Sequence, residues 1–259
     1  AVLLLGASVD LPLLLAAGPA LAAGIVLLVV LGLAGSYALG RLLGLPRELA
    51  VLVACGNAIC GNSAIAAVAP VIHADREHVA SSIAFTAILG VIVVLGLPML
   101  IAPLGLSDYQ YGVLAGLTVY AVPQVLAAAL PVSALAGQVG TLVKLARVLM
   151  LGPVVLCFAL GQRGRARADT RPARLVPWFI VGFLLLAALR SADVLPAAWT
   201  APAAALSHAL TLAAMAALGL GVDVRAVVRT GRPVIVTVTG SLALLVGLAL
   251  ALIGVLGIR

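Results

Sequence analysis

The chain has 259 residues, of which 64% are hydrophobic and only 9% are charged. A soluble domain carries about 25% charged residues, so this composition excludes a cytosolic enzyme, a disordered chain and a nucleic-acid-binding domain. The formal net charge of +7 does not indicate nucleic-acid binding, because the 15 basic residues include a single lysine and aromatic residues make up only 4%. We therefore predict an all-α, polytopic membrane helix bundle.

Eight apolar segments are candidates to cross a bilayer core, which needs about 20 residues of helix. In chain order they are about 20–40, 49–72, 79–103, 111–131, 139–160, 176–190 (short), 201–221 and 234–256. Because the connectors are short, we predict a single transmembrane domain over 1–259. The chain opens on Ala1 within an apolar run and has no charged leader, which we interpret as the end of a helix in an N-terminally truncated fragment.

The arginines give the predicted orientation. Ten of them fall in the loops at 41–48, 161–175 and 222–233, which this order of spans places on one side of the membrane. Arg76, Arg190 and Arg259 fall on the other side. Because cytoplasmic loops carry an excess of Lys and Arg, we predict a multi-pass protein of the bacterial inner membrane.

Two internal similarities bear on the fold. Residues 5–10 resemble 218–223, and the predicted topology puts the two copies in opposite orientations, as in transporters with inverted repeats. Residues 65–71 also resemble 126–132, but the topology makes those two segments parallel. Either one of these segments is re-entrant or the second similarity is only one of composition.

A run of small and polar residues interrupts the second span. Asn57, Gly61, Asn62 and Ser63 are costly in hydrocarbon unless they are paired or face a cavity. We predict a break in the helix near 56–61, with a second half-helix that begins at Asn62 and Ser63. Its free N–H groups would form an anion site within the membrane. The alternative is close packing of helices through small residues.

The fourth span contains a second candidate break. Pro123 removes a backbone donor, and Gln124 offers an uncharged amide that both donates and accepts hydrogen bonds. Together with Tyr120, these residues predict a discontinuity that faces the first one. The alternative is an ordinary proline kink.

Two basic residues lie inside the fifth span. Lys144 and Arg147 are three residues apart and therefore share one helix face. No acidic residue lies in the interior of any predicted span to neutralise them, so they would suit an anionic substrate. The alternative is that both side chains snorkel to the outer interface.

Several functional patterns are missing from the sequence. A proton- or sodium-coupled antiporter usually needs a carboxylate in the middle of a span, and none is found here. There is no catalytic or cofactor motif, so we expect neither an enzyme nor a bound cofactor. His73 and His78 lie beside Asp75 and Glu77, and we interpret this group as a solvated turn and not as a metal site.

Residues 56–72 and 143–155, with the segment at 218–223, resemble the YeiH-like membrane proteins. That family is commonly labelled as sulfate exporters and is grouped with the cation/proton antiporter and bile-acid transporter superfamily. The resemblance implies inverted repeats, broken and crossed helices, and about two further helices before the start of this chain. Many relatives carry a His-Glu pair where this chain has Tyr120 and Ala121, so the resemblance does not extend to proton coupling there.

We therefore predict a secondary transporter or exporter that moves a small anion, sulfate or another sulfur oxyanion, by alternating access. The alternatives are an exchanger like the cation/proton antiporters and an integral-membrane enzyme. The partners would be the anion and the lipid bilayer, with no nucleic acid, and the pattern is compatible with a homo-oligomer. The predicted substrate-binding residues are Asn57, Gly61, Asn62, Ser63, Tyr120, Pro123, Gln124, Lys144 and Arg147.

Overall fold

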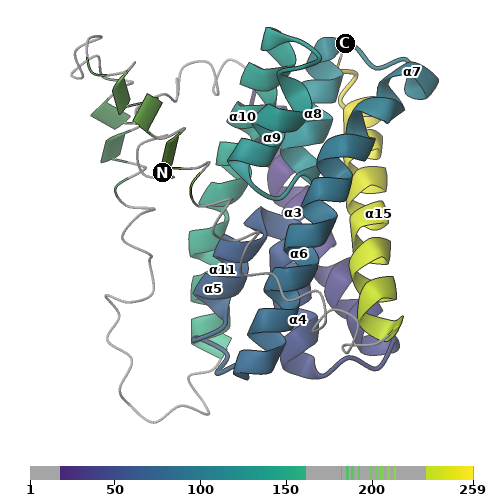
Figure 1. Ribbon diagram of the computed structural model, residues 1–259, viewed down its shortest axis with the longest axis vertical. Coiled ribbons are helices and arrows are strands. Elements are labelled where there is room, and N and C mark those ends of the chain that lie inside the picture. The colour runs from purple at the N-terminus through teal and green to yellow at the C-terminus, as the bar shows by residue number, and fades with distance from the viewer. Residues whose placement is uncertain are drawn as a thin grey trace. The chain divides into compact units, whose positions relative to one another are not determined.

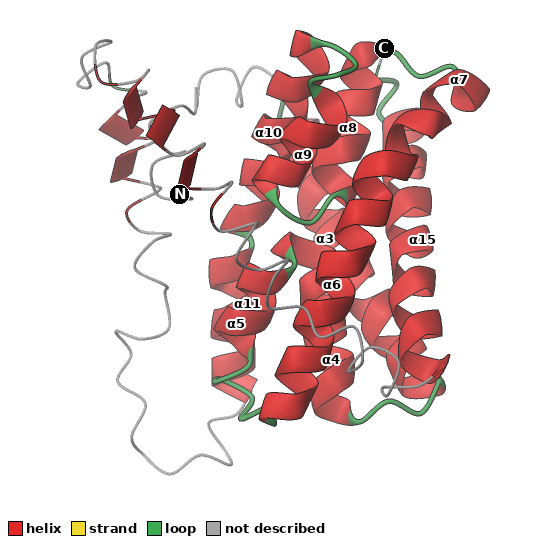
Figure 2. Ribbon diagram, viewed as in Figure 1, coloured by secondary structure: helices red, strands yellow, loops and turns green. Residues whose placement is uncertain are grey.

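The computed structural model describes residues 18–161 and 232–258, with isolated positions between 182 and 213. Every element in these ranges is a helix (Figure 2), which confirms the prediction of an all-α membrane bundle. The chain divides into two compact units, residues 1–19 with 152–221 and residues 20–151 with 222–259. The second unit contains nearly all of the described residues. The prediction of a single domain over 1–259 stays a prediction.

Four helical segments are long and apolar enough to cross a membrane. They are α3 (Pro19–Leu42), α6 (Arg76–Gly96) with η3 (Leu97–Leu100) and α7 (Ile101–Leu104), α10 (Ala134–Leu149) with α11 (Leu151–Gly161), and α15 (Arg232–Val255). These helices coincide with the segments at 20–40, 79–103, 139–160 and 234–256 that the sequence predicts as spans. The predicted spans at 176–190 and 201–221 lie outside the continuously described residues.

Helices α3 and α15 pack side by side in opposite directions. Glycines on α3 make room for larger side chains on α15, since a Cβ at Gly24 would lie 2.6 Å from Cδ1 of Leu252 and one at Gly32 would lie 2.8 Å from Cδ2 of Leu245. Farther along, a Cβ at Gly40 would lie 3.3 Å from Cγ2 of Thr237. Small residues on one membrane helix make room for the side chains of its neighbour, and these three contacts give the register of the pair.

The segment predicted as a span at 49–72 is instead a re-entrant hairpin. Its first arm is α4 (Arg47–Cys55) with the π-helix η2 (Gly56–Cys60), and its second arm is α5 (Asn62–Val68). Glu48, in the first turn of α4, accepts a hydrogen bond from the backbone N–H of Asp75 at 3.2 Å and lies 3.3 Å from Nδ1 of His78 on α6. The chain therefore returns to the end at which it entered.

The segment predicted as a span at 111–131 is a second re-entrant hairpin. Its arms are α8 (Asp108–Thr118) and α9 (Val122–Ala129). The hydroxyl of Tyr111, near the start of α8, donates a 3.0 Å hydrogen bond to the backbone carbonyl of Ala128, near the end of α9. This contact brings the two ends of the hairpin together, so the chain again returns to the end from which it came.

The two hairpins enter from opposite ends of α6. Figure 1 shows α4 and α5 beside the beginning of α6, and α8 and α9 at the end where α6 continues into α7. The similar segments 65–71 and 126–132 begin in the second arm of each hairpin and end in the turn after it. Re-entry, one of the two alternatives left open by the sequence, thus accounts for this similarity, and it applies to both segments. The similarity between 5–10 and 218–223 lies outside the described residues.

Re-entry also corrects the side to which one arginine was assigned. The sequence places Arg76 opposite Arg41 and Arg47, because it counts 49–72 as a full crossing. In the structure Arg76 opens α6 beside the base of the first hairpin, at the same end of the bundle as Arg41 and Arg47. The antiparallel register of α3 and α15 brings Arg232 to that end too. This correction strengthens the positive-inside argument.

Candidate functional site

The tips of the two hairpins meet inside the bundle. Gly61 joins η2 to α5 with φ +60° and ψ −126°, a conformation that side chains disfavour. A Cβ at Gly61 would lie 3.0 Å from Cβ of Tyr120, which is in the second tip. Both predicted breaks are confirmed, and the second faces the first as expected.

The second break is an extended linker and not a proline kink. Val119 and Ala121 have extended backbones, with ψ of 146° and 149°, between the end of α8 and the start of α9. Pro123 lies in the first turn of α9, where its missing N–H removes no helical hydrogen bond. The proline therefore starts the second arm. It does not distort a continuous helix.

The side chains of Lys144 and Arg147 on α10 contact the inner ends of η2 and α8, the first arms of the two hairpins. Nζ of Lys144 donates a 2.7 Å hydrogen bond to the carbonyl of Ile59, and Nε of Arg147 donates one of 2.7 Å to the carbonyl of Ala58. The two Nη groups of Arg147 donate to the carbonyls of Asn57 and Leu117. Both side chains are fully buried, so the snorkelling alternative is wrong.

These bonds explain how two cations are buried without an acidic partner. The last carbonyls of a helix have no partner within it and carry a partial negative charge. In this structure η2 and α8 end inside the bundle and present such carbonyls to α10. The sequence alone does not reveal this counter-charge, because a free carbonyl appears only once two helices stop inside the membrane.

Two of the predicted residues keep polar atoms without a partner. Asn57 is buried, and its Nδ2 donates to the carbonyl of Val238 on α15 at 3.2 Å, while its Oδ1 has no hydrogen-bond partner. The hydroxyl of Tyr120 is also buried without a partner. Because leaving such a group unpaired costs free energy, each of them is available to a ligand.

One face of helix α6 contacts a polar residue from the second arm of each hairpin. The hydroxyl of Thr86 donates to Oδ1 of Asn62 at 2.5 Å. One turn further, Gly90 leaves room for Gln124, since a Cβ there would overlap its Nε2. Oε1 of Gln124 accepts the N–H of Ala121 at 3.2 Å. Thr86 and Gly90 are absent from the residues predicted from sequence, because nothing in their own segment marks it as facing both tips.

Ser63 differs from its neighbours in the first tip. It follows Asn62 in the first turn of α5 and its side chain is exposed on the surface of the described bundle. No hydrogen bond links it to Tyr120, Gln124 or Lys144 in the structure. Its predicted part in binding an anion stays a prediction.

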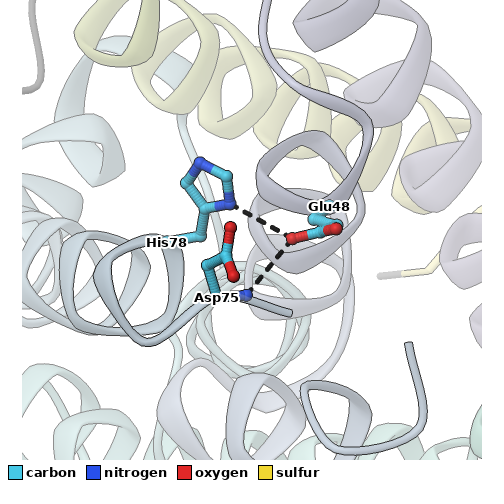
Figure 3. Close-up of side chains that lie close together, drawn as sticks. All are labelled: Glu48, Asp75 and His78. Atoms are coloured by element: carbon cyan, nitrogen blue, oxygen red, sulfur yellow. Dashed lines mark hydrogen bonds and ion pairs between the residues drawn. The ribbon is translucent and has the colours of Figure 1, made fainter. Parts of the chain in front are cut away.

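A further cluster fastens the base of the first hairpin. Figure 3 shows the carboxylate of Glu48 between the backbone N–H of Asp75 and the ring of His78, each joined to it by a dashed line. The possible ligand atoms of these three side chains lie within 4.8 Å of one another, and all three are at least partly exposed. The sequence pointed to a solvated turn here and omitted Glu48, which is 27 residues from Asp75 in the chain.

Comparison with known proteins places the chain in a family. Residues 1–238 match the family model described as conserved hypothetical protein 698. Over 260 residues the chain is 58% identical to a UPF0324 membrane protein of Brucella melitensis, which covers 100% of the chain and 72% of that protein. It is 55% identical over 258 residues to one from Bradyrhizobium diazoefficiens, covering 98% of the chain and 73% of the relative.

A more distant relative is the UPF0324 membrane protein TauZ of Paracoccus denitrificans. It is 39% identical over 255 residues, which is 94% of the chain and 72% of TauZ. No solved structure matches the chain. The relatives are bacterial and named as membrane proteins, and four long apolar helices are present, so the prediction of a multi-pass protein of a bacterial membrane is confirmed. The chain belongs to the conserved hypothetical protein 698 family, the UPF0324 membrane proteins, which is the YeiH-like family that its motifs resemble.

Proposed function

We propose that the chain is the membrane core of a secondary transporter for a small anion, with sulfate or another sulfur oxyanion as its substrate. One observation carries this proposal. Two re-entrant hairpins enter from opposite ends and meet at tips that hold Lys144 and Arg147, the two charged side chains that are buried among the described residues. A membrane protein with no transport role would have little use for broken helices and buried cations at its centre.

Opposed hairpins suit alternating access. Each tip separates the centre of the bundle from the end at which its own hairpin enters, so moving one hairpin would expose the centre to one side only. Discontinuous helices that meet near the midplane are the usual place for substrate in secondary transporters. The close approach of Gly61 and Tyr120 marks the place where the two barriers touch.

The polar groups at the tips favour an anion over a cation. Lys144 and Arg147 supply positive charge, and the first N–H groups of each second arm point toward the tips. Because the donors of Arg147 are directed to carbonyls, we propose that it acts through its electrostatic field. Direct contacts would then come from uncharged donors, the amides of Asn62 and Gln124 and the hydroxyl of Tyr120. This proposal is of a transporter and not of an enzyme.

A ligand screen on the purified protein tests this function. Sulfate, sulfite, thiosulfate, taurine and carboxylates would be compared for their effect on the melting temperature, since a ligand that binds the folded state raises it by mass action. We expect a saturable rise with at least one sulfur oxyanion, and uptake of the same anion by proteoliposomes. An absence of both would refute the proposal.

Two glutamines provide a matched pair of variants. Gln124 caps α9 at the tip, while Gln110 caps α8 at the outer end of the same hairpin in the same position of the first turn. Gln124→Glu adds a negative charge beside the proposed site and should abolish the response to the anion. Gln110→Glu adds the same charge far from the tips and should leave that response unchanged. Equal responses in the two variants would remove Gln124 from the site.

A further inference from the structure

Three buried oxygen atoms on α3, η2 and α15 have no hydrogen-bond partner. They are the hydroxyls of Ser36 on α3 and Ser241 on α15 and the amide oxygen of Asn57 in η2, and all three residues are fully buried. Other buried hydroxyls in the described helices donate to the carbonyl four residues earlier, as Ser82, Thr118 and Thr237 do. The two serines make no such bond, so their hydroxyls are free for something else.

The packing brings these three residues to one place. The antiparallel register that faces Gly32 with Leu245 and Gly40 with Thr237 also places Ser36 opposite Ser241. Asn57 reaches the same part of α15, because its Nδ2 donates to the carbonyl of Val238. Its neighbour Ala58 lies against α3, with Cβ 3.6 Å from a Cβ built on Gly32. Ser36, Asn57 and Ser241 therefore lie on the faces of α3, η2 and α15 that pack against one another.

The chemistry of these atoms indicates the class of ligand. Asn57 is held on both sides, since its Nδ2 donates to Val238 and its backbone carbonyl accepts from Arg147, and this leaves Oδ1 as a fixed acceptor. Neutral hydroxyl and carbonyl oxygens are ligands for hard cations. No buried carboxylate accompanies them among the described residues, as a divalent ion would favour. We propose that Ser36, Asn57 and Ser241 bind a small monovalent cation, for which sodium is the probe.

This site would couple to the anion, a step that rests on the proposed function. Asn57 also contacts Arg147 through its backbone, so the positive charge of Arg147 and Lys144 opposes a cation at its side chain. An anion at the tips would offset that charge and favour the cation. Because such coupling is reciprocal, sodium should in turn increase the affinity for the anion.

The first test compares sodium with an organic cation of equal charge. The melting temperature of the purified full chain is measured in sodium chloride and in choline chloride at the same ionic strength, so that the anion is constant. We expect a saturable rise with sodium in the unmodified protein. We expect Ser36→Ala and Ser241→Ala to lose this rise, and Ser82→Ala, which removes a paired hydroxyl, to keep it.

The melting temperatures of the serine variants in choline chloride show whether these variants fold. Each serine-to-alanine change removes an unpaired buried hydroxyl, so the variants should melt in choline chloride at or above the temperature of the unmodified protein. Equal melting temperatures in sodium and choline for the unmodified protein would overturn the proposal. A sodium effect that survives in both serine variants would overturn it as well.

Sulfate titrations in the two salts separate this proposal from the function on which its coupling rests. We expect sodium to lower, by several fold, the sulfate concentration that gives half of the thermal shift, and Ser36→Ala to remove that difference. A sulfate response that is identical in the two salts would overturn the coupled cation and leave anion binding intact. A sodium effect with no response to any anion would uphold the cation site and refute the proposed function.

Discussion

Replacing Arg147 by methionine tests whether this side chain holds the two broken helices together. Its guanidinium donates to three backbone carbonyls, those of Asn57, Ala58 and Leu117, while Lys144 donates to the single carbonyl of Ile59. A buried acceptor left without its partner costs about 1–3 kcal/mol. Arg147→Met should therefore lower the free energy of unfolding by about 3–9 kcal/mol and Lys144→Met by about 1–3 kcal/mol.

The assay is reversible unfolding of the purified protein in mixed micelles, with Arg147→Lys as a third variant. Lysine keeps the charge but lacks the fork of donors, so it should recover only part of the loss. The reasoning fails if Lys144→Met destabilises the protein as much as Arg147→Met. It also fails if Arg147→Lys is as stable as the unmodified protein, because charge and not hydrogen-bond geometry would then be the property that matters.

Three further predictions concern the hairpins. Gly90→Ala should reduce the response to the anion in thermal-shift titrations, because its Cβ would overlap the amide nitrogen of Gln124. Gly96→Ala on the same helix should leave these titrations unchanged, because its Cβ would meet nothing within 4 Å. Gly61→Ala should lower the free energy of unfolding more than Gly44→Ala. Both glycines have positive φ, but only at Gly61 would the new Cβ meet a neighbour, Cβ of Tyr120 at 3.0 Å. Unfolding curves with equal midpoints would contradict this. Glu48→Gln weakens the partly exposed pair with His78 and should lower the free energy of unfolding by about 1 kcal/mol or less. It should also speed hydrogen exchange at the base of the first hairpin, where Glu48 accepts the N–H of Asp75. Protection equal to that of the unmodified protein would show that Glu48 does not hold this base together.

Local chemistry explains why the breaks could be predicted. Glycine and asparagine in an apolar helix give the backbone alternatives to helical hydrogen bonding, and proline at 123 cannot continue a helix from the preceding turn. These effects act within a few residues of the chain. The start of α5 at Asn62 and the position of Pro123 in the first turn of α9 follow from them.

The partners of the predicted site residues could not be predicted in the same way. Lys144 is 85 residues from Ile59 in the chain, and Arg147 is 90 residues from Asn57. Thr86 and Gly90 lie in an apolar helix and carry no signal that they face two hairpin tips. Contacts between residues so far apart in the chain depend on the path of the intervening segments, and local hydropathy does not predict that path.

By itself the sequence determined that this is an all-α bacterial membrane protein of the UPF0324 family, with two interrupted helices and two cations in an apolar span. Only the tertiary structure decided that both interrupted segments turn back, and that the two cations bond to the carbonyls at their tips. The physical reason is that hydropathy records how long and how apolar a segment is, and a segment of about 20 residues satisfies that measure whether it crosses the bilayer or returns. The direction of the second arm is set by contacts at the base of each hairpin, between residues that are distant in the chain.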